Sequence, residues 1–135
     1  MNRLFYIIYN SYYKHGKYNN DNPSLTVGGM FLVFFLSICL DIAFLIKLME
    51  DPLFLNFPKK SKPIMLLVIS MFGSIVYFLF FYNQKHHKIY EIYKEDVFLN
   101  SKTAKYLGFF IVFFTIVSPL IIGLIRNKIY FDYWI

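Results

Sequence analysis

Charged side chains are scarce in this sequence: Asp, Glu, Lys and Arg make up 16% of its 135 residues, whereas a soluble domain uses about 25%. Apolar residues make up 58%, against about 45–50% in a soluble domain. A small soluble fold leaves much of its surface in water and has no room to bury this excess. The composition therefore excludes an ordinary soluble domain and predicts a protein that lies in lipid.

Cysteine is nearly absent as well, since Cys39 is the only one in the chain. A single cysteine cannot form a disulfide within the chain, and the apolar neighbours of Cys39 predict a buried, unreactive thiol. The histidines, His15, His86 and His87, have no cluster of Cys, Asp or Glu at ligand spacing beside them. We therefore expect no metal site and no cofactor, and we interpret His86 and His87 as solvated residues at a membrane interface.

Catalytic motifs are missing too. The sequence has no Ser-His-Asp pattern with a nucleophile elbow, no HExxH motif, no Gly-rich phosphate loop and no facing pair of intramembrane carboxylates. We therefore expect no catalytic residues and a protein that is not an enzyme. The net charge of +6 is scattered over the polar segments, which argues against a nucleic-acid partner and favours the lipid bilayer.

What the chain does have is three long apolar segments, which predict an all-α integral membrane protein with one transmembrane helical domain over residues 1–135. About 20 apolar residues in a helix cross a hydrocarbon core of about 30 Å. The predicted spans are about 25–49, 63–82 and 104–125. Pro23 and Pro63 stand at the starts of the first two, where a proline is well tolerated.

The segments outside the spans are rich in aromatic and basic residues. Residues 4–13 are too short an apolar cluster for a signal peptide, and their helical spacing predicts an interfacial helix. A flexible tail and a partial fourth span are the alternatives. Neither proline nor glycine occurs between Ser74 and Lys105, so we expect the second helix to continue as a cytoplasmic, amphipathic extension over residues 84–97. Asn100 and Ser101 should end that extension and cap the third span.

Lysine and arginine set the expected orientation, because cytoplasmic loops of membrane proteins are enriched in them. With three spans, the N-terminal tail and the connection before the third span share one side. By a narrow margin they carry more Lys and Arg than the other side. Heavy use of Tyr, Phe, Ile, Lys and Asn is typical of an AT-rich bacterial genome. We therefore expect a multi-pass protein of the bacterial inner membrane with a cytoplasmic N-terminus.

Asp41 is the one acidic residue well inside a predicted span. An aspartate at the bilayer centre costs roughly 2.5–3.5 kcal/mol on insertion scales, so it is a functional candidate by default. It would then handle protons or cations, or line the pore of an oligomer. The simpler interpretation is structural: the carboxyl is neutral, or it hydrogen-bonds a hydroxyl on another helix. Four hydroxyls are candidates: Ser70, Ser74, Thr115 and Ser118.

Small residues mark the expected helix contacts, because close packing drives helix association in lipid. The second span offers Ser70, Gly73 and Ser74. The third span offers Gly108, Thr115 and Ser118. Pro119 should kink the third span, and the carbonyl that it frees should be satisfied by Thr115 or by a neighbouring helix.

Three patterns recur along the chain: the tyrosine-rich Ile8–Lys14, the span opener Asn20–Pro23, and the second span continuing into Tyr90–Lys94. By these patterns the whole chain resembles small, uncharacterised multi-span membrane proteins of Bacteroidota-type bacteria. The resemblance implies a bacterial inner membrane and no particular activity.

Two functions remain open from the sequence. The first is a non-enzymatic accessory or scaffold subunit, which acts through helix–helix assembly with copies of itself or with a membrane partner protein. The second is a homo-oligomeric pore-forming or membrane-permeabilising protein, holin-like or a defence effector, with Asp41 lining the lumen. A membrane protein of the bacteriocin-immunity type is a weaker alternative. We expect the first function, because it requires no specialised role of any particular residue.

Overall fold

The computed structural model describes residues 1–13, 23–48 and 62–132, and every regular element in these ranges is helical. The short turns η2 and η3 are π-helical and 3-10 in form. In chain order the elements are α1 (Asn2–Tyr13), α2 (Pro23–Leu48), α3 (Lys62–Val76), η2 (Tyr77–Phe81), η3 (Tyr82–Gln84), α4 (Lys85–Tyr93) and α5 (Lys102–Phe131).

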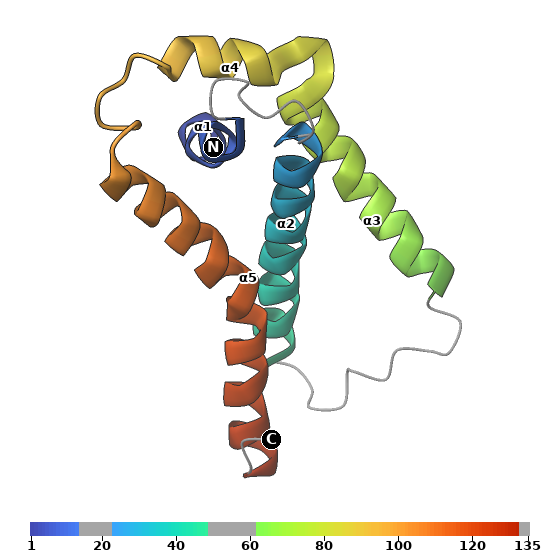
Figure 1. Ribbon diagram of the computed structural model, residues 1–135. Coiled ribbons are helices and arrows are strands. Elements are labelled where there is room, and N and C mark those ends of the chain that lie inside the picture. The colour runs from blue at the N-terminus through green and yellow to red at the C-terminus, as the bar shows by residue number, and fades with distance from the viewer. Residues whose placement is uncertain (14–22, 49–61, 133–135) are drawn as a thin grey trace.

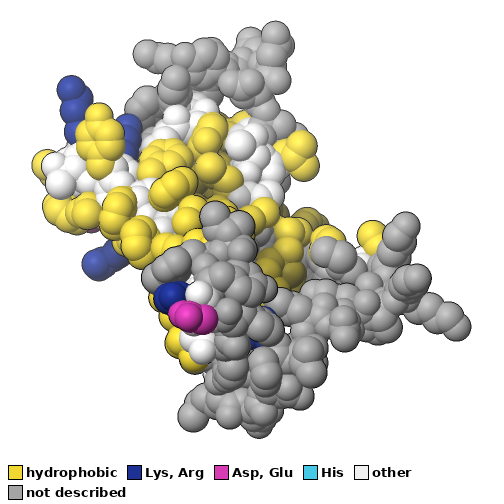
Figure 2. Space-filling model, turned by 90° about the horizontal axis from the view of Figure 1, so that it is seen from below, with side chains coloured by type: hydrophobic (Ala, Val, Ile, Leu, Met, Phe, Trp, Pro, Cys, Tyr) yellow, Lys and Arg dark blue, Asp and Glu magenta, His cyan; other side chains and the backbone are white. Residues whose placement is uncertain are grey.

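Three stretches of the described chain are long and apolar enough to cross a membrane: Pro23–Leu45, Leu66–Tyr93 and Lys102–Ile129. Hydrophobic side chains dominate the described surface in Figure 2, with few charges among them. Large apolar side chains such as Leu66 (68% exposed) and Leu120 (68% exposed) point away from the bundle. Such a surface is stable only in lipid, so the predicted all-α membrane fold is confirmed.

α1 lies across one end of the bundle and contributes five of the fifteen buried hydrophobic core residues, more than any other helix. Figure 1 looks along α1, which is surrounded by α2, α4 and α5, and all three contact it. The six residues from Phe5 to Asn10 are all buried, so every side of this helix is covered. The predicted interfacial segment is therefore a packed helix that lies crosswise to the spans, and it is not a fourth span.

Three phenylalanines join α1 to the spans. The rings of Phe5 and Phe80 stack with their centroids 4.3 Å apart, and Phe31 of α2 lies 5.5 Å from Phe5 and 5.0 Å from Phe80. Phe5 is 0% exposed, and the other two are each 1% exposed. Such ring pairs contribute about 0.5–1.5 kcal/mol each beyond their area burial. This cluster holds α1, α2 and η2 together.

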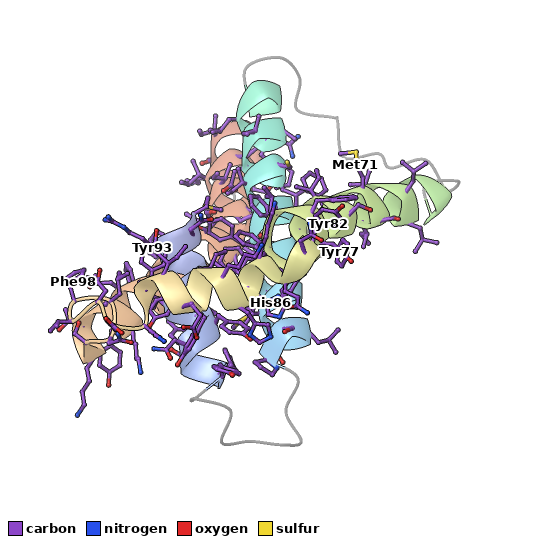
Figure 3. All side chains as sticks on the ribbon, turned by 90° about the horizontal axis from the view of Figure 1, so that it is seen from above. Met71, Tyr77, Tyr82, His86, Tyr93 and Phe98 are labelled. Atoms are coloured by element: carbon purple, nitrogen blue, oxygen red, sulfur yellow. The ribbon has the colours of Figure 1, made fainter. Side chains whose placement is uncertain are left out.

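The second span does not continue straight into its extension. The backbone turns at Asn83 and Gln84, whose φ angles are 54° and 55°, and α4 then crosses the end of the bundle (Figures 1 and 3). The π-helical turn η2 precedes this bend, and Lys85 Nζ donates to the Phe78 carbonyl at 3.0 Å. The absence of proline and glycine had predicted a continuous helix. The extension is present, but it ends at Tyr93 rather than at residue 97.

α5 bends midway along its length in Figure 1, and Pro119 is the proline inside it. Its upper half diverges from α2, with α1 between them, while its lower half packs against α2. Ser101 caps α5 as predicted, since its side chain accepts from Ala104 N at 3.1 Å. Cys39 is exposed, not buried as predicted, because its side of α2 faces away from the bundle.

Candidate functional site

Asp41 and Ser118 meet where α2 packs against the lower half of α5. Ser118 Oγ lies 2.5 Å from Asp41 Oδ2. The other carboxyl oxygen, Oδ1, is buried and has no hydrogen-bond partner in the described part of the chain. The carboxyl group is therefore turned into the contact between α2 and α5.

Ser118 also lies beside the break that Pro119 makes in α5. Proline has no N–H, so the carbonyl of Thr115 loses its helical hydrogen bond. Ser118 Oγ lies 2.7 Å from this carbonyl oxygen. The Thr115 hydroxyl donates instead to Ile111 O at 2.9 Å. The sequence had suggested Thr115 or another helix as the partner of the freed carbonyl, and Ser118 takes that place.

The Ser118 hydroxyl has two oxygen neighbours but only one proton to donate. That proton can go to the Asp41 carboxyl or to the Thr115 carbonyl. The Ser118 side chain therefore links α2 to the break in α5.

The three small residues predicted on the second span do not share one contact. Ser70 and Ser74 are exposed, and Ser74 Oγ donates to Ser70 O at 2.9 Å within the same helix. Gly73 alone faces α2, where a β-carbon would lie 3.6 Å from Leu32 Cδ1. The two serines therefore lie on the lipid-facing side of α3.

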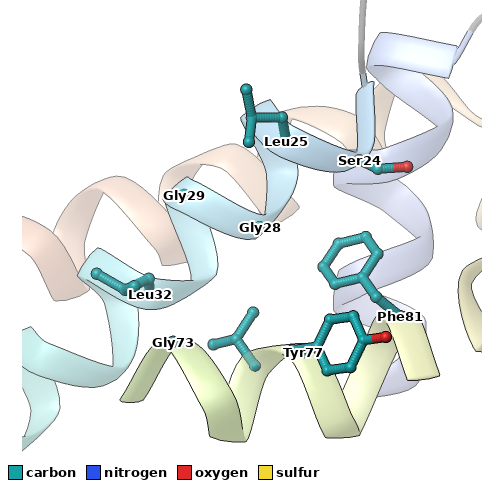
Figure 4. Close-up of a pocket in the computed structure, with 9 residues that line it drawn as sticks. Ser24, Leu25, Gly28, Gly29, Leu32, Gly73, Tyr77 and Phe81 are labelled. Carbon is teal, nitrogen blue, oxygen red and sulfur yellow. The ribbon is translucent and has the colours of Figure 1, made fainter. Parts of the chain in front are cut away.

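A groove of about 560 Å³ opens between α2 and α3 (Figure 4). Gly29 leaves part of it empty, since nothing lies within 4 Å of a β-carbon built there, whereas a β-carbon at Gly28 would lie 3.2 Å from Phe81. The lining is mostly apolar. It consists of Ser24, Leu25, Gly28, Gly29, Leu32, Gly73, Val76, Tyr77 and Phe81.

Asn100 is the centre of a hydrogen-bonded cluster that sequence reasoning missed. Its Oδ1 accepts from Tyr6 Oη at 2.7 Å and from Asn10 Nδ2 at 2.8 Å. Its Nδ2 donates to the carbonyls of Lys94 and Asp96 at 2.9 and 2.8 Å. One side chain thus ties α1 to the turn between α4 and α5. Only the position of Asn100 before a helix cap was visible in the sequence.

Burial raises the pKa of Tyr6 above its usual value, and the hydrogen bond with Asn100 acts in the opposite direction. Burial also raises the pKa of Tyr9, against the effect of a hydrogen bond with Ser24. Both hydroxyls therefore keep their protons at neutral pH, and Tyr6 remains a donor to Asn100.

His86 is packed rather than solvated, contrary to the interpretation from sequence. Its ring centroid lies 5.8 Å from that of Tyr9 and 5.4 Å from that of Phe81. Its Nδ1 is buried and lacks a hydrogen-bond partner within the described residues. His87 lies next to it, with the ring centroids 4.2 Å apart. The bend at Asn83 and Gln84 is what turns His86 toward α1.

In the described ranges, no three His, Cys, Asp or Glu side chains lie close enough together to hold a metal ion. Hydrogen bonds join the helices at Asp41 and at Asn100, and a groove opens between α2 and α3. Comparison of the chain with models of protein families, with curated proteins and with solved structures finds no match.

Proposed function

We propose that this chain is a non-enzymatic accessory or scaffold subunit that acts by helix–helix assembly in the membrane. The observation that carries the proposal is the position of Asp41, whose Oδ2 contacts Ser118 and whose Oδ1 is buried. The one acidic side chain within the predicted spans thus makes a contact between two helices of the same chain. The exposed surface of the spans then offers partners mainly apolar packing.

The groove between α2 and α3 is the surface that we assign to assembly. It opens toward lipid, and Gly29 lets another backbone approach α2 closely. α3 supports this assignment, because Leu66, Leu67 and Met71 are 68%, 67% and 51% exposed. The occupant is a transmembrane helix of a partner subunit or of a second copy.

The competing proposal is a homo-oligomeric pore with Asp41 facing the lumen. It requires Asp41 to leave its contact with Ser118 between α2 and α5. We rank it second for this reason.

We further propose that the end holding α1 and α4 faces the cytoplasm of a bacterial inner membrane. Basic residues outnumber acidic ones there among the described residues, in keeping with the enrichment of Lys and Arg in cytoplasmic loops. The basic residues are Arg3, Lys85, Lys88, Lys94, Lys102 and Lys105, and the acidic ones are Glu91, Glu95 and Asp96.

The role of Asp41 is tested by comparing Asp41→Asn with Asp41→Leu. An asparagine amide can donate to Ser118, whereas leucine cannot, so we expect Asp41→Asn to keep near wild-type thermal stability and Asp41→Leu to lose about 1–3 kcal/mol. Membrane potential is measured in bacteria that express each protein at matched abundance. We expect no depolarisation. Depolarisation by the wild type that both variants abolish would support the pore instead.

The assembly surface is tested with Gly29→Leu, which places a bulky side chain at the groove, where nothing in the described chain lies within 4 Å of a β-carbon. The matched control is Gly123→Leu, because a β-carbon at Gly123 also has nothing within 4 Å. In membranes of its own host, solubilised in mild detergent, the tagged wild type should migrate as a complex on native gels. We expect Gly29→Leu to release the monomer and Gly123→Leu to leave the complex intact. A wild type that is monomeric throughout would contradict the proposal.

A further inference from the structure

A second groove, of about 540 Å³, lies between the end of α1 and the start of α5. It combines polar and apolar walls, unlike the groove beside α3. Its lining residues are Ser11 of α1 and Lys102, Lys105, Tyr106 and Phe109 of α5. The two lysines stand in the first turns of α5, at the end of the bundle that also holds α1 and α4 (Figure 1).

The charge of this groove is not neutralised within the described chain. Lys102 and Lys105 are three residues apart on one helix face, where like charges repel. The ion pairs in residues 1–13, 23–48 and 62–132 lie elsewhere, between Lys94 and Glu91 and between Lys128 and Asp132. The first turn of α5 has no acidic residue, so the positive end of the helix dipole adds to the lysines. The groove therefore favours an anion.

The apolar wall continues from the lysines along α5. Phe109 is half-buried and packs edge-on against Tyr12 of α1, with the ring centroids 6.2 Å apart. Tyr106 is 76% exposed and Phe110 is 60% exposed. The apolar stretch that is long enough to cross a membrane, Lys102–Ile129, begins at these residues. A molecule held by the lysines would therefore have a polar end at the interface and an apolar end in lipid.

We propose that this groove binds one anionic phospholipid. Its phosphate lies between the ammonium groups of Lys102 and Lys105, and Ser11 is the nearby hydroxyl. An acyl chain runs along Tyr106 and Phe109. Basic pockets beside transmembrane helices recognise lipid headgroups in this way, and an anionic bilayer surface supplies the ligand at high local concentration. The site is distinct from the assembly groove between α2 and α3 and does not depend on it.

Native mass spectrometry of the full chain tests the proposal. The protein is reconstituted in vesicles of phosphatidylcholine and phosphatidylglycerol in equal amounts, then released into detergent. We expect one retained phosphatidylglycerol per chain and at least tenfold less retained phosphatidylcholine. Equal retention of the two lipids, or the absence of a single defined adduct, would overturn the proposal without reference to any variant.

The variant arm compares Lys102→Gln/Lys105→Gln with Arg3→Gln/Lys88→Gln. Both remove two positive charges from exposed or half-exposed residues at the same end of the molecule, so they weaken general attraction to the bilayer equally. We expect the first to reduce the phosphatidylglycerol adduct at least tenfold and the second to reduce it less than twofold. Equal losses of the phosphatidylglycerol adduct in both variants would show general electrostatic attraction to the bilayer and would contradict a defined site.

A third arm separates a lipid from a soluble phosphate. Inorganic phosphate at millimolar concentration should not displace the phosphatidylglycerol, and Tyr106→Ser should weaken its retention about threefold or more, because the acyl chain contributes to binding. Displacement by phosphate together with an unchanged Tyr106→Ser would contradict a lipid ligand.

Discussion

A β-carbon at Gly108 of α5 would lie 2.7 Å from Cγ2 of Ile7 in α1. Real β-carbons do not approach other heavy atoms so closely, so this position needs glycine for α1 to lie where it does. Gly108 stands in the half of α5 that diverges from α2, and α1 fills the space between the two helices. The pair thus marks the contact on which the packing of the N-terminal helix depends.

Gly108→Ala should destabilise the fold for this reason. Alanine is a better helix former than glycine by about 1 kcal/mol, but here the added methyl group forces α1 to shift, at a cost of about 1–3 kcal/mol typical of overpacking. Gly123→Ala is the control, since nothing lies within 4 Å of its β-carbon. In thermal unfolding in detergent, we expect Gly108→Ala to melt below the wild type and Gly123→Ala at or above it. The same rise in both would contradict the close packing of α1.

The hydrogen bonds of Asn100 should hold α1 in place. Tyr6→Phe removes one donor to Asn100 and should reduce the free energy of unfolding by about 1 kcal/mol. Asn100→Leu removes every side-chain bond of the cluster and should cost about 2–4 kcal/mol, since Tyr6 and Asn10 then lose their partner. In Asn100→Leu, hydrogen exchange should show faster opening of α1 than of α2. Tyr82→Phe, at an exposed ring, is the control and should change nothing measurable in stability.

The bend between η2 and α4 can be tested with two glycine substitutions that should change the free energy of unfolding in opposite directions. A left-handed backbone costs a residue other than glycine roughly 1–2 kcal/mol, so Gln84→Gly should stabilise the protein by about 0.5–1 kcal/mol. Lys88→Gly, in the middle of α4, should destabilise it by about 1 kcal/mol. Chemical unfolding in micelles measures both. Destabilisation by Gln84→Gly would indicate a straight helix at this point.

His86→Phe should raise the stability of the packed end. The histidine Nδ1 is buried and lacks a partner within the described residues, and a buried unsatisfied nitrogen costs about 1–3 kcal/mol. Phenylalanine keeps the ring contacts with Tyr9 and Phe81. We expect a gain of about 1 kcal/mol in thermal unfolding. A loss of similar size would mean that the nitrogen has a partner, and His87→Phe serves as the control because that residue is exposed.

Much of the membrane-spanning architecture was accessible from composition and spacing. The predicted spans 25–49, 63–82 and 104–125 fall on α2, on α3 and η2, and on α5, because an apolar run long enough to cross the hydrocarbon core forms a helix. Residue 49 lies outside the described residues, and α5 continues past residue 125 to Phe131. The helix cap at Ser101 could be predicted as well, because its side chain accepts from a backbone N–H only three residues away. Both features depend on local properties of the chain.

The partners of the polar residues could not be read in this way. Asp41 had four candidate hydroxyls, and Ser118 became its neighbour only because α5 bends midway and its lower half packs against α2. Asn100 and Tyr6 are 94 positions apart, and no periodicity connects them. The bend at Asn83 and Gln84 was missed because neither residue is glycine or proline, and packing of α4 over α1 stabilises a backbone that local preference disfavours.

The sequence by itself determined that this is a helical membrane protein with three spans, since burial of apolar helices in lipid follows from length and composition. Only the tertiary structure decided that α1 is a core helix, that Asp41 points into the contact between α2 and α5, and that Lys102 and Lys105 line a groove beside α1. The reason is physical: these relationships arise from contacts between helices that are distant in the chain, and each helix alone leaves its neighbours undetermined.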